Sequence, residues 1–72
     1  MKKKLEIYVS LLNEGINVWR PVSAEFISDN LYQILGEVPE GEEWQFQPGE
    51  IVECKKAELS ESKHLVAYKR QT

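Results

Sequence analysis

Hydrophobic and polar positions alternate along most of this chain with a period of two, the period of a β-strand with one buried face. The run at residues 4–12 is the clearest, and its apolar face consists of Leu5, Ile7, Val9 and Leu11. Comparable runs predict further strands at residues 16–28, 31–35, 50–58 and 64–69. Short strands spaced by about ten residues are typical of an all-β barrel or sandwich.

Turn residues separate these runs. Gly15 ends the first run and supplies a positive φ. Asp29 and Asn30 tolerate left-handed backbone angles, so they predict a hairpin turn. Pro48 and Gly49 fit the two central positions of a type II turn. A last turn is expected at residues 60–62.

The second run contains Pro21, which cannot donate to a sheet ladder and therefore indicates an edge, a bulge or a bend. A bend suits a small barrel in which one long strand serves both halves of a curved sheet. The side that faces inward is expected to change near this proline. After it, Val22, Ala24 and Phe26 are the expected inner residues, and Ile27 replaces Phe26 if a bulge follows Ala24.

The pattern predicts a small five-stranded SH3-like barrel, with a five-stranded oligonucleotide-binding barrel as the second choice. The latter usually needs more residues and a helix between its middle strands. A competing helix over residues 55–65 has poor apolar spacing. The expected inner residues of the barrel include Ile7, Val9, Ala24, Tyr32, Ile34, Val52 and Cys54.

The length of 72 residues corresponds to one domain near the lower size limit for independent folding. The single cysteine allows no internal disulfide, which together with the lack of a signal peptide predicts a cytoplasmic protein. Lysines follow Met1, but Glu6 and Asn13 interrupt any apolar stretch that could serve as a secretory signal. No run is long and apolar enough for a membrane span, and none is expected.

Charge is distributed unevenly along the chain, which has a formal net charge of −3. Every charged residue from Glu37 to Glu53 is acidic, whereas the cations gather near the two ends. The acidic stretch is interpreted first as an ordinary solvated loop. The alternative is a loop that repels nucleic acid and faces a basic partner surface.

Two tryptophan-containing stretches carry a resemblance. The first is Gly15-Ile16-Asn17-Val18-Trp19-Arg20-Pro21-Val22, and the second is Trp44-Gln45-Phe46-Gln47-Pro48-Gly49. Together they resemble a group of small bacterial proteins that share Gly-x-x-Val-Trp-Arg-Pro-Val and Trp-x-Phe-x-Pro-Gly. The resemblance covers residues 14–54, implies a barrel and implies no activity. The aromatic run with which true SH3 domains bind polyproline is absent after the first strand, so that activity is not transferred.

Catalytic chemistry is not indicated. Cys54 lies in an apolar strand pattern and is expected to be a core residue, and His64 is expected at the surface. One histidine and one cysteine cannot form a structural zinc site, and the glutamates of residues 37–43 lack the spacing of a calcium loop. No catalytic, cofactor-binding or metal-binding residue is assigned, and an enzyme is not expected.

The candidate site is a rim of Trp19, Arg20 and Trp44, to which Glu42 and Glu43 are added. Tryptophan and arginine are frequent interface hot spots, so an exposed rim predicts a protein-interaction module, either with another protein or as a homodimer. The structural alternative is that Trp19 caps the core and Arg20 pairs with a glutamate. A second hypothesis is an RNA- or ribosome-associated barrel that uses the Lys2–Lys4 arm, Lys69 and Arg70, which the net acidic charge disfavours.

Overall fold

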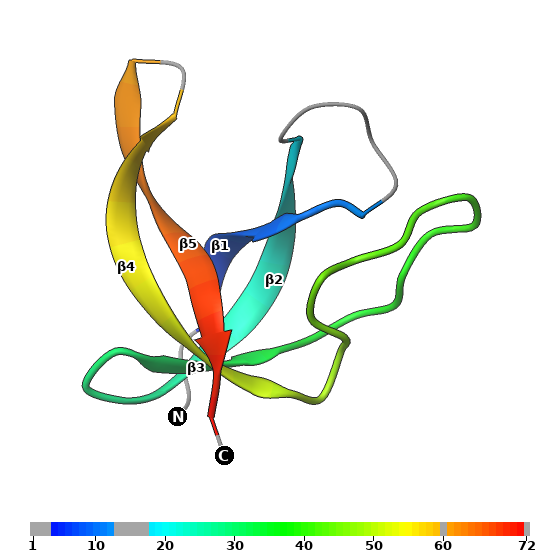
Figure 1. The fold of residues 1–72 in the computed structure, drawn as a ribbon. Coiled ribbons are helices and arrows are strands. Elements are labelled where there is room, and N and C mark those ends of the chain that lie inside the picture. Colours follow the sequence, from blue (N-terminus) through cyan, green and yellow to red (C-terminus); the bar gives the residue numbers. More distant parts are fainter. Residues whose placement is uncertain (1–3, 13–17, 60, 72) are drawn as a thin grey trace.

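The computed structural model describes residues 4–12, 18–59 and 61–71, and over these residues the chain is an all-β, five-stranded SH3-like barrel (Figure 1). Its strands are β1 (Lys4–Ser10), β2 (Trp19–Ser28), β3 (Leu31–Ile34), β4 (Ile51–Leu59) and β5 (Ser62–Arg70). The predicted all-β fold is confirmed. The competing helix over residues 55–65 is wrong, because β4 and β5 pair there from Lys56↔Leu65 to Leu59↔Ser62.

The long strand β2 serves both halves of the curved sheet, as the sequence predicts. Its first part pairs with β1 from Ser10↔Trp19 to Lys4↔Glu25, and its last part pairs with β3. Pro21 lies within the β1–β2 ladder opposite Tyr8 and is exposed. The expected change of inward side near this proline does not occur, because the alternation continues through it.

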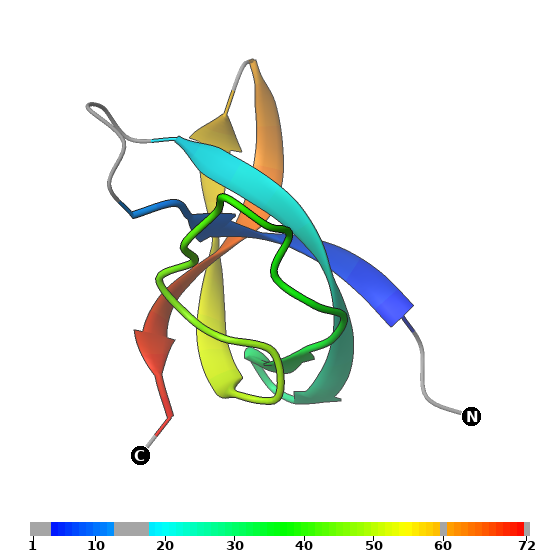
Figure 2. The same cartoon turned by 90° about the vertical axis from the view of Figure 1, so that its right-hand side faces the viewer.

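The barrel closes at a narrow seam between β1 and β5, which form a single parallel pair, Tyr8↔Val66. Beyond this crossing, the far part of β4 and β5 projects from the barrel as a two-stranded ribbon (Figures 1 and 2). On the other side of β4, pairing with β3 ends at Glu53, and the Cys54 amide donates to the Asn30 carbonyl at 2.9 Å. Within the described part of the chain, the ribbon therefore has no neighbouring strand on the β3 side.

The core fills the barrel with the inward side chains of every strand and two aromatic rings from the segment between β3 and β4. Its buried members are Ile7, Val9, Leu11, Val22, Ala24, Tyr32, Ile34, Trp44, Phe46, Val52, Cys54 and Ala67. The inner residues expected of the first, third and fourth strands are confirmed, including Cys54.

Phe26 corrects the sequence-based expectation of an inner residue, because 44% of it is exposed. The last described β1–β2 pair is Lys4↔Glu25, so Phe26 lies beyond the region that β1 covers. Its ring packs edge-on against Tyr32 at 5.6 Å between centroids. Ile27, the alternative, is 39% exposed, and the strand irregularity lies between Phe26 and Ser28.

The observed turns use the residues that the sequence indicates. Asp29 has φ of 49° in the β2–β3 hairpin, and Gly49 has φ of 93° after Pro48. The Gly49 amide donates to the Ile34 carbonyl at 2.7 Å, which ties the end of the long connection to β3. The predicted turn at residues 13–15 and the first lysines of the N-terminal arm lie outside the described residues.

Candidate partner-binding site

The connection between β3 and β4 folds back over one end of the barrel and brings Trp44 to the end of β1. Leu11 and Trp44 form an isolated antiparallel bridge. On either side of it, the Leu12 amide donates to the Glu43 carbonyl at 2.7 Å, and the Gln45 amide donates to the Ser10 carbonyl at 2.8 Å. Trp44 is only 4% exposed and closes this end of the core.

A polar cluster of Arg20, Glu42 and Trp44, here called the Trp44 clamp, locks this connection to β2. The Trp44 indole Nε1 donates to Glu42 Oε1 at 2.9 Å. The Arg20 guanidinium donates through Nε to Oε1 at 3.2 Å and through Nη2 to Oε2 at 2.6 Å. One carboxylate thus satisfies the indole and holds the guanidinium in a bidentate pair, an arrangement with defined geometry.

These contacts favour the ionised form of Glu42. The hydrogen bond from Trp44 has the largest effect and lowers the pKa of Glu42. Burial opposes it, and the hydrogen bond and the charge of Arg20, each with a smaller effect, lower the pKa further. Glu43 is exposed, and its main chain supports the connection. Arg20, Glu42 and Trp44 therefore form a structural contact, as in the alternative in which Arg20 pairs with a glutamate.

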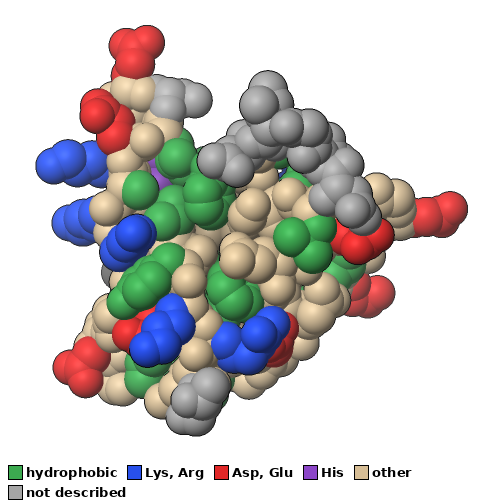
Figure 3. All heavy atoms as spheres, viewed as in Figure 1, with side chains coloured by type: hydrophobic (Ala, Val, Ile, Leu, Met, Phe, Trp, Pro, Cys, Tyr) green, Lys and Arg blue, Asp and Glu red, His purple; other side chains and the backbone are tan. Residues whose placement is uncertain are grey.

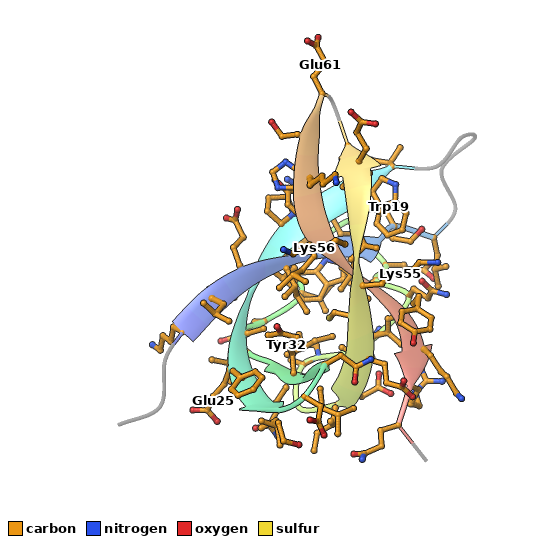
Figure 4. All side chains as sticks on the ribbon, turned by 90° about the vertical axis from the view of Figure 1, so that its left-hand side faces the viewer. Trp19, Glu25, Tyr32, Lys55, Lys56 and Glu61 are labelled. Carbon is orange, nitrogen blue, oxygen red and sulfur yellow. The ribbon has the colours of Figure 1, made fainter. Side chains whose placement is uncertain are left out.

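Trp19 lies on the opposite face of β2 from Arg20, because successive side chains of a strand point to opposite sides. It pairs with Ser10 on the outer face of the β1–β2 ladder and is half-buried. Figure 4 shows Trp19 outside the barrel, and in that view Trp19 and Lys55 project to the same side of β4. The predicted rim is thus divided between two faces, and the core cap is Trp44 instead of Trp19.

Around Trp19, the outer faces of the strands form a partly open apolar surface with one cation. We call it the Trp19 surface, and its members are Trp19, Lys55, Ala57, Leu59, Val66 and Tyr68. Val66 is the most deeply buried member of this surface. It is 2% exposed, but it is not part of the main core cluster. Figure 3 shows hydrophobic side chains gathered at the base of the projection formed by β4 and β5.

Tyr68 and Lys55 extend this surface toward the C-terminal end of β5. Tyr68 is 42% exposed, and the Lys55 ammonium lies 5.1 Å from the centre of its ring. The Tyr68 hydroxyl donates to Glu53 Oε1 at 3.2 Å. Such a cation–π contact holds the aromatic ring and the lysine stem in one place at the surface.

Strands β4 and β5 carry most of the described cations, together with the carboxylates Glu53 and Glu58 of β4. Strand β5 contains two lysines and one arginine and no carboxylate, and β4 adds Lys55 and Lys56. Two of these cations are paired, Lys69 with Glu53 at 3.9 Å and Arg70 with Glu50. Figure 3 shows cations over β4 and β5, carboxylates at the tip of the same ribbon, and further carboxylates over the connection on the far right.

The described part of the chain contains one thiol, Cys54, and one imidazole, His64. Cys54 is 3% exposed, and burial raises the pKa of its thiol to about 11, which keeps it protonated at neutral pH. The His64 ring lies against Tyr8 with 4.8 Å between centroids. No group of three histidine, cysteine or acidic side chains there is arranged to hold a metal ion, and no helix there could cross a membrane.

Comparisons with known proteins give no match: no family model, no curated protein and no solved structure is significantly similar to this chain. The candidate site therefore depends on its own geometry.

The sequence-based reasoning missed most of the Trp19 surface. The sequence pattern singles out neither Lys55 nor Tyr68, and Ala57 and Leu59 also fall within the competing helix over residues 55–65. A period-two reading of residues 55–59 places Lys55, Ala57 and Leu59 on one face of a strand. This alternation can be seen in the sequence, but it does not show which other strands lie beside this face of β4.

Proposed function

We propose that this domain is a non-enzymatic protein-interaction module that acts in the cytoplasm and binds its partner through the Trp19 surface. The observation that carries the proposal is the position of Trp19, half-buried on the outside of a closed barrel whose core is filled by other residues. The Trp19 surface combines an indole, an exposed tyrosine and a cation. Tryptophan and tyrosine are among the residues that dominate binding energy at protein interfaces.

Partial burial of Trp19 supports a binding role in a second way. An aromatic ring already held by neighbouring strands loses little conformational entropy when a partner covers its free face. Tyr68 is restrained in the same manner by Lys55 and Glu53. The surface is therefore pre-organised for contact.

RNA binding is a second candidate, favoured by one observation: β4 and β5 together carry five cations and the exposed Tyr68. Phosphate binding needs unpaired cations, and here Lys69 and Arg70 are already held by carboxylates. The acidic connection between β3 and β4 would also repel the phosphate groups of RNA. A mobility-shift assay with mixed RNA at low salt would support this candidate if a complex formed and weakened steeply with salt.

The test of the proposed function compares two variants that each remove an aromatic side chain. Wild type, Trp19→Ala and Phe26→Ala are used as baits in a native lysate, and retained proteins are compared. Phe26→Ala is the matched control, because Phe26 is an exposed aromatic residue at a different end of the same strand. We expect a partner that is kept by Phe26→Ala and lost by Trp19→Ala.

Folding is checked in the same samples by circular dichroism and thermal unfolding. Retention of every partner by a folded Trp19→Ala variant would overturn the proposal. Sedimentation of the wild type over a range of concentrations identifies the case in which the partner is a second copy of the chain.

A further inference from the structure

The part of β4 beyond Glu53 has an edge with no described neighbour. Pairing with β3 ends at Glu53. From Lys55 to Leu59, β4 pairs only with β5 among the described residues. An edge of this kind presents backbone donors and acceptors that can pair with another chain. Ala57 is the middle residue of this open stretch.

The hydrogen bond of Cys54 shows which residues of β4 face this edge. Its amide donates to the Asn30 carbonyl at 2.9 Å, on the β3 side of the strand. Alternate residues of a strand direct their amide and carbonyl to the same side. Lys56 and Glu58 therefore direct both backbone groups to the open edge, whereas residues 55, 57 and 59 direct theirs toward β5.

Charge selects how two copies of this edge can pair. The hydrogen bonds of an antiparallel pair join residues that direct their backbone groups toward each other. Lys56 can therefore lie opposite a second Lys56 or opposite Glu58, and Glu58 can also lie opposite a second Glu58. Registers that pair identical residues place like charges directly opposite each other, which is destabilising. The mixed register places each Lys56 opposite Glu58 of the second copy, so both cross-strand pairs are attractive.

The attractive register is centred on Ala57, which lies opposite its own copy. Lys55 then lies opposite Leu59 of the second copy, so the register uses the whole open stretch and ends beside the β2–β3 turn. Ala57 and Leu59 are half-buried in the single chain, whereas Lys55 is exposed. The methylene stem of a lysine covers apolar surface while its ammonium stays in water, so this pairing is also favourable.

The other face of the ribbon carries the charged pairs. Lys56 is exposed and forms no ion pair with another described residue. Figure 4 shows Lys55 and Lys56 on opposite sides of β4. Within one chain, Glu58 lies opposite Lys63 of β5. In the mixed register each Glu58 has Lys63 on one side and the second copy's Lys56 on the other, so opposite charges alternate across the joined strands.

From these observations we propose that the β4 edge at residues 55–59 pairs with the same edge of a second copy, in the register centred on Ala57, to form a symmetric dimer. Each edge covers the other, so the contact closes at two copies. The two-fold axis is perpendicular to the joined sheet, and the faces that carry Ala57 therefore lie on the same side. This contact goes beyond the proposed function and does not depend on it.

Dimerisation is measured on the full chain by sedimentation equilibrium and by amide hydrogen exchange over a range of protein concentrations. A contact made by one strand pair is small and belongs to the weak class of interfaces, so high concentrations are included. We expect a monomer–dimer equilibrium without larger species. The amides of Lys56 and Glu58 should exchange more slowly as the concentration rises, whereas that of Ala57, which is directed toward β5, should change little.

Charge is tested with two variants and their mixture. Lys56→Glu places glutamates opposite each other and Glu58→Lys places lysines opposite each other, so each should weaken self-association roughly tenfold. An equimolar mixture restores opposite charges at both pairs and should dimerise as the wild type does. Lys4→Glu is the matched control at an exposed lysine of β1. It should change the dissociation constant by less than about twofold, because distant exposed charges are screened by salt.

A chain that stays monomeric at every concentration, or that forms larger species, would overturn the inference. A dimer whose affinity neither charge variant changes would also reject it, as would a mixture of folded variants that does not associate. Protection of the edge amides that appears only when a different protein is added would assign this edge to a strand of that protein instead. If the dimer forms and Trp19→Ala keeps every natural partner, the dimer stands and the proposed function is rejected.

Discussion

The two tryptophans occupy contrasting environments, although each lies next to charged residues and shortly before a proline. Trp44 is almost completely buried, and its indole N–H is satisfied by a carboxylate that also holds Arg20. Trp19 is half-buried on the outer face of the sheet, one residue before Arg20 in β2. The same aromatic side chain therefore closes the barrel at one position and lies half-exposed on its outer face at the other.

The difference shows how strand geometry separates adjacent residues. Arg20 and Trp19 are neighbours in sequence but point to opposite faces of β2. Arg20 lies opposite Val9 and reaches the connection that carries Glu42. Trp19 lies opposite Ser10 on the outer face of the β1–β2 ladder. A motif that looks like one rim in the sequence supplies two surfaces in the fold.

The largest expected effect that tests this contrast is on stability. Trp44→Ala removes a buried indole and leaves a cavity at the end of the core, so it should lower the free energy of unfolding by about 3–5 kcal/mol. Trp19→Ala removes a half-buried ring and should cost about 1 kcal/mol. Urea unfolding of both variants measures the two values. Equal losses would show that Trp19 is as structural as Trp44.

The ion pair of the Trp44 clamp gives a smaller effect. Arg20→Met keeps the side-chain stem but removes the guanidinium that holds Glu42, and it should lower the thermal midpoint by about 2–5 °C. Lys56→Met is the control, because Lys56 is exposed and has no ion pair with a described residue. An unchanged midpoint in Arg20→Met would mean that the clamp contributes nothing to stability.

Acid should weaken the Trp44 clamp and so lower the free energy of unfolding. The pKa of Glu42 is lowered in the folded state by Trp44 and Arg20, and that of Glu50 is lowered by Arg70 and the Gln47 amide. A lowered folded-state pKa stabilises the fold above the ordinary value of 4.5 and loses this contribution as pH falls below it. Stability measured between about pH 7 and 2 should therefore decline below this value.

The variant Glu42→Gln removes one of the two carboxylates from this titration. Its stability should decline less steeply with acid than that of the wild type. A decline of equal steepness would exclude Glu42 from the acid response.

The smallest expected effect is a difference in the access of solvent to the two indoles. In Trp44→Phe the remaining fluorescence comes from Trp19, and in Trp19→Phe it comes from Trp44. Acrylamide should quench the Trp44→Phe variant more strongly, since Trp19 is half-buried and Trp44 is 4% exposed. Equal quenching in two folded variants would contradict the assignment of separate environments.

Much of the fold follows from local patterning. The period of two in residues 4–12 predicts which face of β1 is buried, and Asp29 and Gly49 adopt the positive φ that their turns require. Phe26 shows where such reasoning fails: its place in the alternation is correct, but no described part of β1 covers it. Alternation reports the face of a strand, whereas burial depends on how far the neighbouring strand extends.

By itself the sequence determined the strands, their turns and most of the core, because these depend on side-chain periodicity and on local backbone preferences. Only the tertiary structure decided which tryptophan is buried and which surface is open. The β1–β5 crossing and the return of Trp44 to Leu11 join residues far apart in the chain, and no local pattern encodes the distance between them.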